Sequence, residues 1–212
     1  MVRAFTELTF TPTVLDLQKE DGSSGLYAPF MEADADRRDR LGDAEAEFIH
    51  QRDGFYQASV AETGWPYVQF KGGPRGFLNV LDEKTIGYAD YRGNRQHLSA
   101  GNLTADSRVS LILMDYPNRR RLKLWGRARL TSRKDAPDLV QSLHVDGYKA
   151  LPERAILITV EAFDWNCPAH IPQRMTLEEL EPQITPFREK MEDLIRENTA
   201  LKEELERLKQ ER

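Results

Sequence analysis

Alternating apolar and polar positions dominate the middle of the chain, from about residue 53 to residue 172. Short apolar runs separated by turn residues are typical of β-strands, and they predict strands at 55–60, 67–70, 77–81, 85–89, 109–114, 121–130 and 155–163. Helices are expected at 44–50, 95–103 and 137–144, with Asn94 as the N-cap of the second. Many short strands and few helices favour a mainly β, α+β protein with an antiparallel barrel.

The segments on either side of this region have different patterns. Residues 1–52 are polar and mixed, with a Gly/Ser break at 21–25, and we expect a helical and loop segment there. Residues 173–212 lose the β pattern, and good helix formers run without interruption from Phe187 to Arg212. We therefore divide the chain into an N-terminal segment at 1–52, a barrel at 53–172, and a linker with a C-terminal helix at 173–212.

Apolar residues of the C-terminal helix recur at alternating steps of four and three, as in a heptad repeat. Position a holds Met191, Asn198 and Leu205, and position d holds Leu194, Leu201 and Leu208. An asparagine within such an apolar seam fixes the register of a parallel two-stranded coiled coil. The g and e positions also favour a parallel pair, since Glu197 at g would face Lys202 at e of a second copy. The pattern predicts a homodimer, and the alternative is one amphipathic helix packed on its own barrel. Because only ~3 heptads are present, the barrel would have to dimerise as well.

Composition and charge narrow the function classes. Hydrophobic residues make up 40% and charged residues 31%, as in globular proteins, and the net charge of −5 argues against nucleic acid or an anionic membrane as a partner. A single cysteine, Cys167, excludes a disulfide within the chain, and the four histidines show no metal-binding spacing. No signal peptide or stretch of ~18 apolar residues is present, so we expect a cytoplasmic protein that makes no membrane contact.

The stretch from Tyr88 to His97 carries the most specific chemistry. A strand ends, and Arg92, Gly93, Asn94 and Arg95 then open the predicted helix. Guanidinium groups offer paired donors to a phosphate, and the free N–H groups of a first helical turn add more. In an acidic chain this is a local anion site, although a capped helix with solvated arginines fits the same residues.

Several motifs in this region resemble those of a known family. They are Ser-Val-x-Glu-Thr-Gly-Trp-Pro-Tyr-Val-Gln at 59–69, Gly-Gly-Pro-x-Gly-Phe at 72–77, Asp-Tyr-Arg-Gly-Asn-Arg-Gln at 90–96 and Phe-Asp-Trp-Asn-Cys-Pro-x-His-Ile at 163–171. Residues 54–172 are similar to the pyridoxamine 5′-phosphate oxidase-like FMN-binding split-barrel family, and more closely to a bacterial subgroup of oxidase-related flavoproteins. The resemblance implies an antiparallel split β-barrel that binds FMN at a dimer interface.

The resemblance also assigns roles to particular residues. Those expected along the isoalloxazine ring are Arg75, Gly76, Phe77, Leu78 and Asn79. Those expected along the ribityl chain are Tyr88, Ala89, Asp90 and Tyr91, followed by Arg92, Gly93, Asn94 and Arg95 at the phosphate. A further contact is expected from Arg121, and Trp165, Asn166 and His170 would close the pocket from the other subunit.

The sequence departs from the true pyridoxamine phosphate oxidases in two places. Their phosphate loop has a Ser-Arg-Lys run where this chain has Gly93, Asn94 and Arg95, and their C-terminal substrate segment is replaced here by the predicted coiled coil. The resemblance therefore implies an FMN-dependent oxidoreductase that acts on another small molecule. The flavin would take hydride from a reduced donor, such as a nicotinamide, and reduce oxygen or a small organic acceptor. No residue is assigned as catalytic.

Other functions stay open at this stage. A flavin-binding or sensing module without catalysis would use the coiled coil to recruit a partner. A haem-binding relative would need an axial ligand such as His97 or His170. A deazaflavin offers a similar ring and a similar phosphate, so the sequence alone leaves it as an alternative to FMN.

Overall fold

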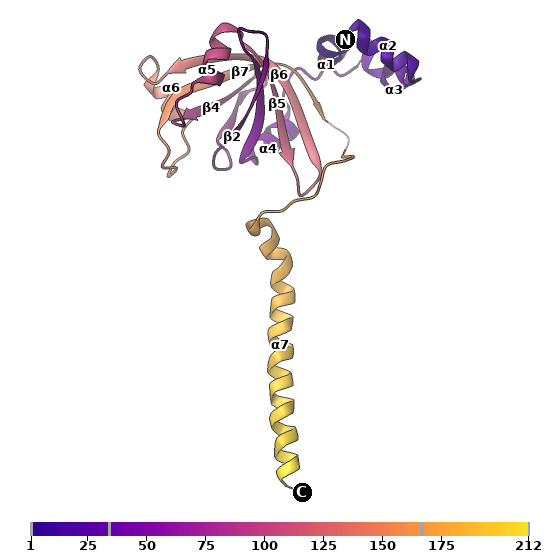
Figure 1. Cartoon of the computed structure of the whole chain (residues 1–212), viewed down its shortest axis with the longest axis vertical. Coiled ribbons are helices and arrows are strands. Elements are labelled where there is room, and N and C mark those ends of the chain that lie inside the picture. Colours follow the sequence, from indigo (N-terminus) through magenta and orange to yellow (C-terminus); the bar gives the residue numbers. More distant parts are fainter. Residues whose placement is uncertain (1, 34, 166–167, 212) are drawn as a thin grey trace. The chain divides into compact units, whose positions relative to one another are not determined.

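A computed structural model of the chain describes residues 2–33, 35–165 and 168–211. Its centre is a seven-stranded sheet in which every neighbouring pair is antiparallel, with the order β2-β1-β5-β6-β7-β4-β3. The strands are β1 Gly54–Val60, β2 Pro66–Gly72, β3 Leu78–Asp82, β4 Thr85–Tyr91, β5 Arg108–Asp115, β6 Arg120–Ser132 and β7 Pro152–Trp165 (Figure 1). The predicted strands are therefore confirmed, with ends shifted by a few residues.

The sheet curls into a barrel because strands far apart in its order share one core. Phe55 of β1 packs against Tyr88 of β4 at 5.4 Å between ring centroids and stacks on Phe77 at 5.7 Å. Alternate residues of the strands point into this core, and Leu111, Leu113, Leu122, Leu124 and Ile158 are all fully buried. The predicted fold, an antiparallel split barrel with helices at both ends, is confirmed.

Short helices accompany the barrel. They are α1 Ala4–Thr9, α2 Pro12–Glu20, α3 Ser24–Tyr27, the 3₁₀ helix η1 Ala28–Met31, α4 Asp43–His50, α5 Leu98–Ala105 and α6 Pro137–Ser142. Helix α4 places Phe48 and Ile49 in the core, as its apolar positions predict. Helix α1 packs on β7, where Ala4 and Phe5 meet Ala162.

The second predicted helix begins later than the sequence indicates. Helix α5 starts at Leu98, and its N-cap is His97 instead of Asn94. The Asn94 side chain accepts a hydrogen bond from the backbone N–H of Gln96 at 3.1 Å, which forms a local turn. Arg95 is left-handed, with φ of 63°, and a helix cannot continue through that conformation. The expectation that Asn94 caps this helix is therefore wrong.

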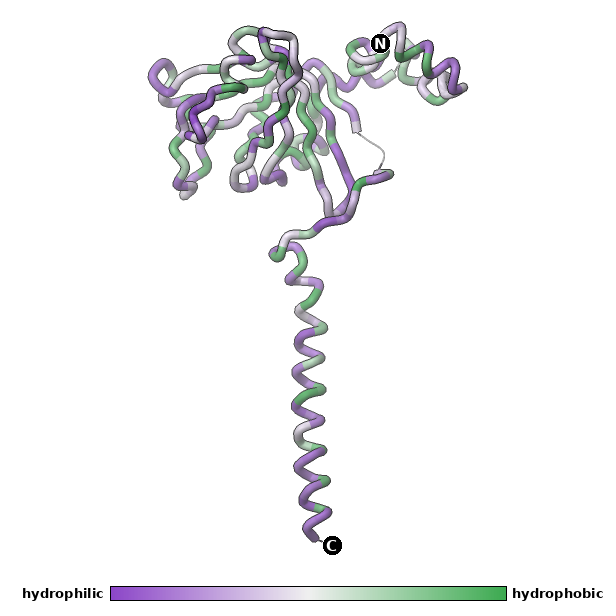
Figure 2. Tube along the Cα trace, in the orientation of Figure 1, coloured by the Kyte–Doolittle hydropathy of each residue, from purple (hydrophilic) through white to green (hydrophobic). Residues whose placement is uncertain are grey.

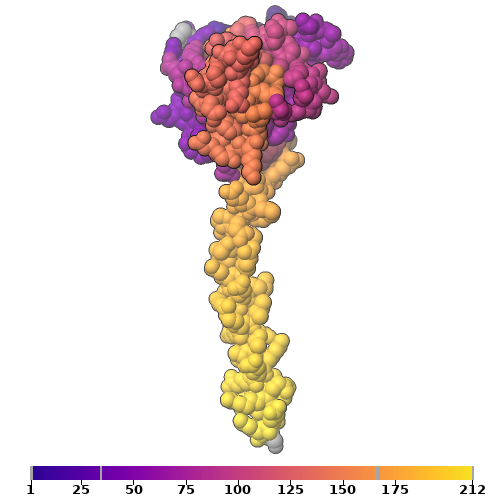
Figure 3. Space-filling model, turned by 90° about the vertical axis from the view of Figure 1, so that its left-hand side faces the viewer, coloured from indigo at the N-terminus to yellow at the C-terminus, as the bar shows by residue number. Residues whose placement is uncertain are grey.

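The C-terminal helix begins earlier than the sequence indicates. Helix α7 spans Leu177–Gln210 and includes Pro182 and Pro186. Thr176 and Glu179 form a capping box, in which the Thr176 hydroxyl accepts from the Glu179 N–H at 3.2 Å. Figure 2 shows apolar positions recurring among polar ones along this helix. The helix has no buried residue, and Figure 3 shows its side chains at the surface on the face in view.

The chain forms two compact units, one of residues 1–115 and 119–170 and the other of residues 116–118 and 171–212. None of the described helices has the length and apolar character needed to cross a membrane.

Candidate functional site

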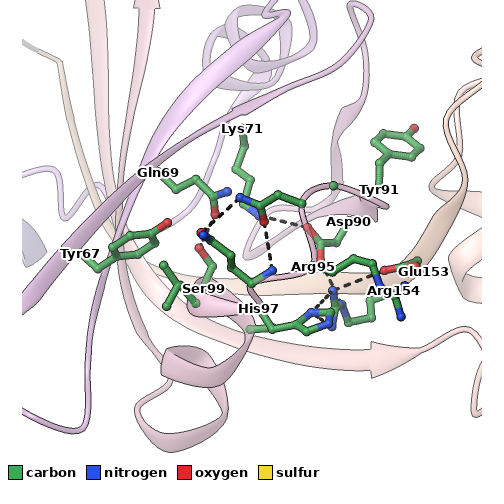
Figure 4. A pocket seen from close by; sticks show the side chains of 15 residues that line it. Tyr67, Gln69, Lys71, Asp90, Tyr91, Arg95, His97, Ser99, Glu153 and Arg154 are labelled. Atoms are coloured by element: carbon green, nitrogen blue, oxygen red, sulfur yellow. Dashed lines mark hydrogen bonds and ion pairs between the residues drawn. The ribbon is translucent and has the colours of Figure 1, made fainter.

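A pocket of about 220 Å³ lies where β2, the ends of β4 and β7 and the loop before α5 meet (Figure 4). Its walls contain Tyr67, Gln69 and Lys71 from β2, Asp90 and Tyr91 from β4, residues 93–100 from the loop and α5, and Glu153 and Arg154 from β7. The pocket therefore brings the predicted phosphate loop together with residues of β2 and of β4 and β7, which lie far apart in the order of the sheet.

Strand β2 supplies one wall because its side chains alternate. Tyr67, Gln69 and Lys71 are partly buried and face the pocket, whereas Val68 and Phe70 point away and are 60% and 57% exposed. Gln69 also accepts a hydrogen bond from the Ser99 hydroxyl at 2.5 Å, which joins the strand to the first turn of α5.

Asp90 organises the cations at the base of the pocket. Its carboxylate binds Lys71 Nζ at 3.0 Å through one oxygen and Arg154 Nε at 3.0 Å through the other. All three side chains are largely shielded from solvent, so the interactions are screened less than those of surface pairs. Asp90 therefore fixes both cations in place. Lys71 keeps further donors for a ligand, whereas the terminal nitrogens of Arg154 also lie 3.4 Å from His97 Nδ1 and 3.8 Å from Glu153.

The loop before α5 has an unusual backbone. Arg95 and His97 have positive φ values of 63° and 56°, which cost free energy in residues other than glycine. His97 provides no side-chain cap, so the first N–H groups of α5 have no capping acceptor from it. Those N–H groups belong to Leu98, Ser99 and Ala100, which line the pocket. The helix N-terminus thus adds donors and a positive dipole end to the site.

Glu153 introduces a negative charge at the rim. Its carboxylate accepts a hydrogen bond from Arg92 Nε at 2.7 Å and lies 3.8 Å from Arg154. The Arg92 hydrogen bond lowers the pKa of the Glu153 carboxyl below its ordinary value, so this carboxylate is charged at neutral pH. Arg92 therefore points toward Glu153 instead of lining the pocket.

The pocket as a whole has an excess of positive charge. Lys71, Arg95 and Arg154 face Asp90 and Glu153, and among the described residues Arg95 has no hydrogen-bond or ion-pair partner. A cation held in a strained loop without an acidic partner is suited to an anionic ligand.

Four of the residues predicted to lie along the flavin ring and the ribityl chain have side chains that cannot reach the pocket. The side chains of Phe77, Leu78, Tyr88 and Ala89 are buried inside the protein. The Tyr88 hydroxyl donates to Gln57 Oε1 at 2.7 Å, and burial raises the pKa of this phenol well above its ordinary value. Any contact that these residues make with a ligand must therefore come from their backbone.

The remaining predicted residues do not line this pocket within one chain. Arg75 is exposed beside Gly76, which has a φ of 82°, and Asn79 borders a separate depression with His50. Arg121 lies on β6 opposite Met114, on the face away from the core. His170 is exposed.

Trp165 lies at the end of β7, away from the phosphate loop. Its indole N–H donates to Glu45 of α4 at 2.7 Å, and its ring packs edge-on against Phe48. Asn166, which was predicted beside it, lies outside the described residues.

Sequence reasoning missed several pocket residues, chiefly Lys71, Gln69, Glu153 and Arg154. The alternation of β2 was a usable signal for the first two, because every second residue from Tyr67 to Lys71 is polar or amphipathic. No local pattern indicates that β7 begins beside this loop, since that follows from the pairing of β4 with β7. Among the described residues, no group of three or more His, Cys, Asp or Glu side chains is placed to hold a metal ion.

Comparisons with solved structures give weak overall similarity. A candidate pyridoxamine 5′-phosphate oxidase from Lactobacillus delbrueckii is 19% identical over 59% of this chain and 94% of its own, with a TM-score of 0.46. HupZ of Group A Streptococcus is 16% identical over 58% and 91%, with a TM-score of 0.44. An FMN-binding protein from Syntrophomonas wolfei is 7% identical over 73% and 97%, with a TM-score of 0.46. No curated protein sequence matches the chain.

The family comparison is specific. The sequence profile of the pyridoxamine 5′-phosphate oxidase family matches residues 41–164, which is more than half of the chain and includes every strand of the barrel except the last residue of β7. The chain therefore belongs to the pyridoxamine 5′-phosphate oxidase family.

Proposed function

We propose that this protein binds FMN as a homodimer and acts as an FMN-dependent oxidoreductase. The observation that carries the proposal is the cationic pocket at the start of α5, formed by the same loop that the sequence predicts as the phosphate site. Family membership supports a flavin as the ligand.

The proposed phosphate position lies between Arg95, Lys71 and the first N–H groups of α5. Arg154 stands behind it, held by Asp90, and Gly93 and Asn94 complete the loop. Arg92 acts at the rim through Glu153. This assignment fits a phosphate because the site combines a helix N-terminus with cations in a partly shielded place.

The ribityl chain and the ring would extend from this pocket along β4 and β3. Tyr91 and Asp90 present side chains there, whereas Tyr88, Phe77 and Leu78 would contribute backbone groups. Pockets that bury a whole cofactor-sized ligand usually have ~300–1,000 Å³, so this pocket needs additional walls to enclose the ring. A second copy of the chain would supply them, with Arg121, Trp165, Asn166 and His170 as the proposed contributors.

An apolar surface on the outer face of the sheet supports dimerisation of the barrel. Tyr56 of β1, Phe70 and Val68 of β2, and Ile112 of β5 are exposed side by side, with Tyr56 paired to both Phe70 and Ile112 in the strand register. Because β2 carries pocket residues on its other face, a second copy on this surface would lie close to the cofactor site. The exposed heptad seam of α7 supports a parallel coiled coil in the same dimer.

Bound FMN would supply hydride and electron transfer, and the protein would supply orientation and control of access. Lys71, Arg95 and Arg154 would fix the phosphate end, and Tyr67 and Tyr91 would border the route into the pocket. A nicotinamide is the proposed donor, and oxygen or a small organic molecule is the proposed acceptor.

The phosphate assignment is tested by comparing FMN with riboflavin, which has the same ring but lacks the phosphate. We expect FMN to bind the apoprotein ~10–100-fold more tightly, since charge-assisted contacts contribute ~1.5–3 kcal/mol each. Arg95→Gln should reduce FMN affinity ~10-fold or more and leave riboflavin affinity unchanged. Fluorescence titration of the free flavin measures both.

A matched control is Arg129→Gln, because Arg129 is another exposed arginine and lies on β6 outside the pocket. It should leave FMN affinity unchanged. Equal binding of FMN and riboflavin, or equal FMN affinity in the wild type and the Arg95 variant, would contradict the phosphate site. The mass of the cofactor released from the purified protein separates FMN from a deazaflavin.

A flavin-binding module without catalysis is the second candidate, favoured by the exposed seam of α7 as a surface for partner recruitment. Anaerobic mixing of the flavin-loaded protein with NADH or NADPH discriminates the two. Rapid loss of the oxidised flavin spectrum supports the oxidoreductase, whereas a flavin that stays oxidised with both donors supports the module.

A further inference from the structure

A second and larger pocket lies between the N-terminal helices and the outer face of β6 and β7. Its volume is about 810 Å³, within the range of small-molecule sites. Half of its lining residues are aromatic, namely Phe5, Phe10, Tyr27, Phe30, Trp125 and Trp165. None of the residues around this pocket belongs to the phosphate loop, so it is a separate place in the fold.

Backbone hydrogen bonds hold the walls of this N-terminal pocket in position. The N–H of Arg3 donates to Phe30 O at 3.0 Å and the N–H of Ala4 donates to Arg37 O at 2.8 Å, while the N–H of Phe163 on β7 donates to Arg38 O at 2.9 Å. The N-terminal segment is therefore tied to itself and to the barrel, and the pocket between them is a built feature.

The aromatic rings present both faces and edges to one another. Phe5 stacks nearly parallel to Trp125, with centroids 6.3 Å apart and an angle of 16°, and contacts Phe30 and Phe10 edge-on at 6.0 and 5.8 Å. Tyr27 continues the same cluster through Phe10 at 5.6 Å. Walls of this kind favour a flat aromatic molecule, because it can stack on some rings and meet the edges of others.

The charged residues of the lining indicate which kind of flat molecule the pocket would bind. Three cations, Arg3, Arg38 and Lys123, line the pocket with a single acid, Asp164. Lys123 binds Asp164 at 3.0 Å and Arg38 lies 3.9 Å from it, so this one carboxylate is already shared. Arg38 also lies 3.6 Å from Asp36, which is outside the lining. The lining therefore has an excess of positive charge in a chain whose net charge is −5.

Arg3 is the cation most in need of an acceptor. Its guanidinium lies over the face of Phe30 at 3.8 Å, and its Nε atom is buried without a hydrogen-bond partner among the described residues. Burial lowers the pKa of this guanidinium, and the neighbouring charge of Arg38 acts in the same direction. A buried donor without a partner is unfavourable, and an incoming carboxylate would satisfy it.

We infer that the N-terminal pocket binds a planar aromatic carboxylate, which stacks among its rings with the carboxylate directed at Arg3 and Lys123. One lining residue, Trp165, is also proposed to reach the flavin of a second copy, but the inference does not rest on the proposed flavin function. Its occupant would be a second ligand, either a substrate or an effector.

Three probes that share one ring system and differ in charge test the inference. They are 2-naphthoate, the neutral 2-naphthalenemethanol and the cationic 2-naphthylmethylammonium, titrated calorimetrically into the full-length protein as purified. We expect 2-naphthoate to bind about tenfold or more tightly than the alcohol, as one or two charge-assisted contacts provide, and the ammonium compound to bind weakest. Equal affinities for the three probes, or no binding by any of them, would overturn the inference.

Variants locate the binding to this pocket. Arg3→Gln and Lys123→Gln should each reduce the preference for 2-naphthoate over the alcohol about tenfold, without changing flavin content. Arg129→Gln, on β6 outside the pocket, should leave that preference unchanged. Lys123 lies in the barrel, so its variant tests the site even where a change at Arg3 loosens the N-terminal helices. An unchanged preference in both variants, or displacement of flavin by 2-naphthoate, contradicts the inference.

Discussion

Asp90 binds two cations at once. Because one carboxylate serves both, the pocket keeps more positive than negative charge. Each of its oxygens is committed to a different cation, Lys71 or Arg154, at 3.0 Å. Arg95 is left unpaired among the described residues, in a backbone conformation that costs free energy. The protein therefore fixes two of the cations, whereas the third, Arg95, is proposed to contact the ligand directly.

The negative charge of Glu153 would repel an anionic ligand in the pocket. The prediction that follows rests on the proposed phosphate site. Glu153→Gln removes a negative charge from the pocket wall, so FMN should bind about 3–10-fold more tightly, while riboflavin affinity should stay unchanged. Fluorescence titration measures both ligands. The matched control is Glu161→Gln, since Glu161 lies on β7 like Glu153 and also pairs with an arginine, Arg127 of β6, but is outside this pocket. Weaker FMN binding in the Glu153 variant would contradict the prediction.

The Arg92–Glu153 pair also gives a pH dependence of stability. Because the pKa of Glu153 is lowered in the folded protein, the pair contributes stability above the ordinary glutamate value of ~4.3 and loses it as the pH falls through the lowered value. Arg92 is 58% exposed, so solvent screening limits the contribution to a few tenths of a kcal/mol.

Urea unfolding of the wild type and Glu153→Gln measures this effect. The wild type should be slightly more stable at about pH 6, and the difference should be smaller at about pH 3, because the lowered pKa of Glu153 means that the stabilisation is lost as the pH falls. A difference that is the same at both pH values would show that the ion pair is not its source.

At the scale of the element, the sequence predicts strands well and their surroundings less well. The strands follow from apolar alternation, because each has one face in the barrel core. The start of α5 was misread because the Asn94 side chain closes a local turn instead of capping a helix. The start of α7 was missed because prolines usually end helices, although Thr176 and Glu179 carry the capping-box pattern. Only part of the cation site could be predicted from the sequence. Arg95 belongs to the predicted phosphate loop, whereas Arg154 is brought beside that loop by the pairing of β4 with β7.

Gly126 provides a prediction about β6. The register of β6 with β7 shifts between Trp125 and Gly126, and a Cβ at Gly126 would overlap the carbonyl oxygen of Thr159. Backbone atoms of a central strand cannot yield easily, so Gly126→Ala should lower the free energy of unfolding by about 1–3 kcal/mol. Chemical denaturation measures this change.

Gly101 is the control for that substitution. It lies within α5, and a Cβ there would meet no atom within 4 Å. Gly101→Ala should therefore leave stability unchanged or raise it by about 0.5–1 kcal/mol, because alanine favours the helix. Similar losses in both variants would indicate that close approach at Gly126 is not the cause.

At the scale of the whole molecule, three surfaces have different proposed occupants. The pocket before α5 is proposed for a phosphate, the N-terminal pocket for an aromatic carboxylate, and the outer sheet face with the α7 seam for a second copy. The first two are lined by charged side chains together with tyrosines or aromatic rings, whereas the third consists of apolar residues such as Phe70 and Leu194, which are 57% and 50% exposed.

Asn198 tests the proposed coiled coil in the full-length protein. Asn198→Leu removes the polar residue that would specify a parallel dimer, so sedimentation equilibrium should show higher oligomers or mixed states. Thr199→Leu adds a similar apolar side chain one position outside the seam and should leave the wild-type state unchanged. An identical oligomeric state in all three proteins would contradict a seam through Asn198.

The two prolines of α7 have a consequence for how this helix opens. Neither Pro182 nor Pro186 can donate to the carbonyl four residues earlier, so the turns before Phe187 lack backbone bonds that the later turns possess. Those first turns should exchange their amide hydrogens fastest and be cut first by a non-specific protease. The heptad segment would then be released as an intact peptide, separable from the rest of the chain by a single nick.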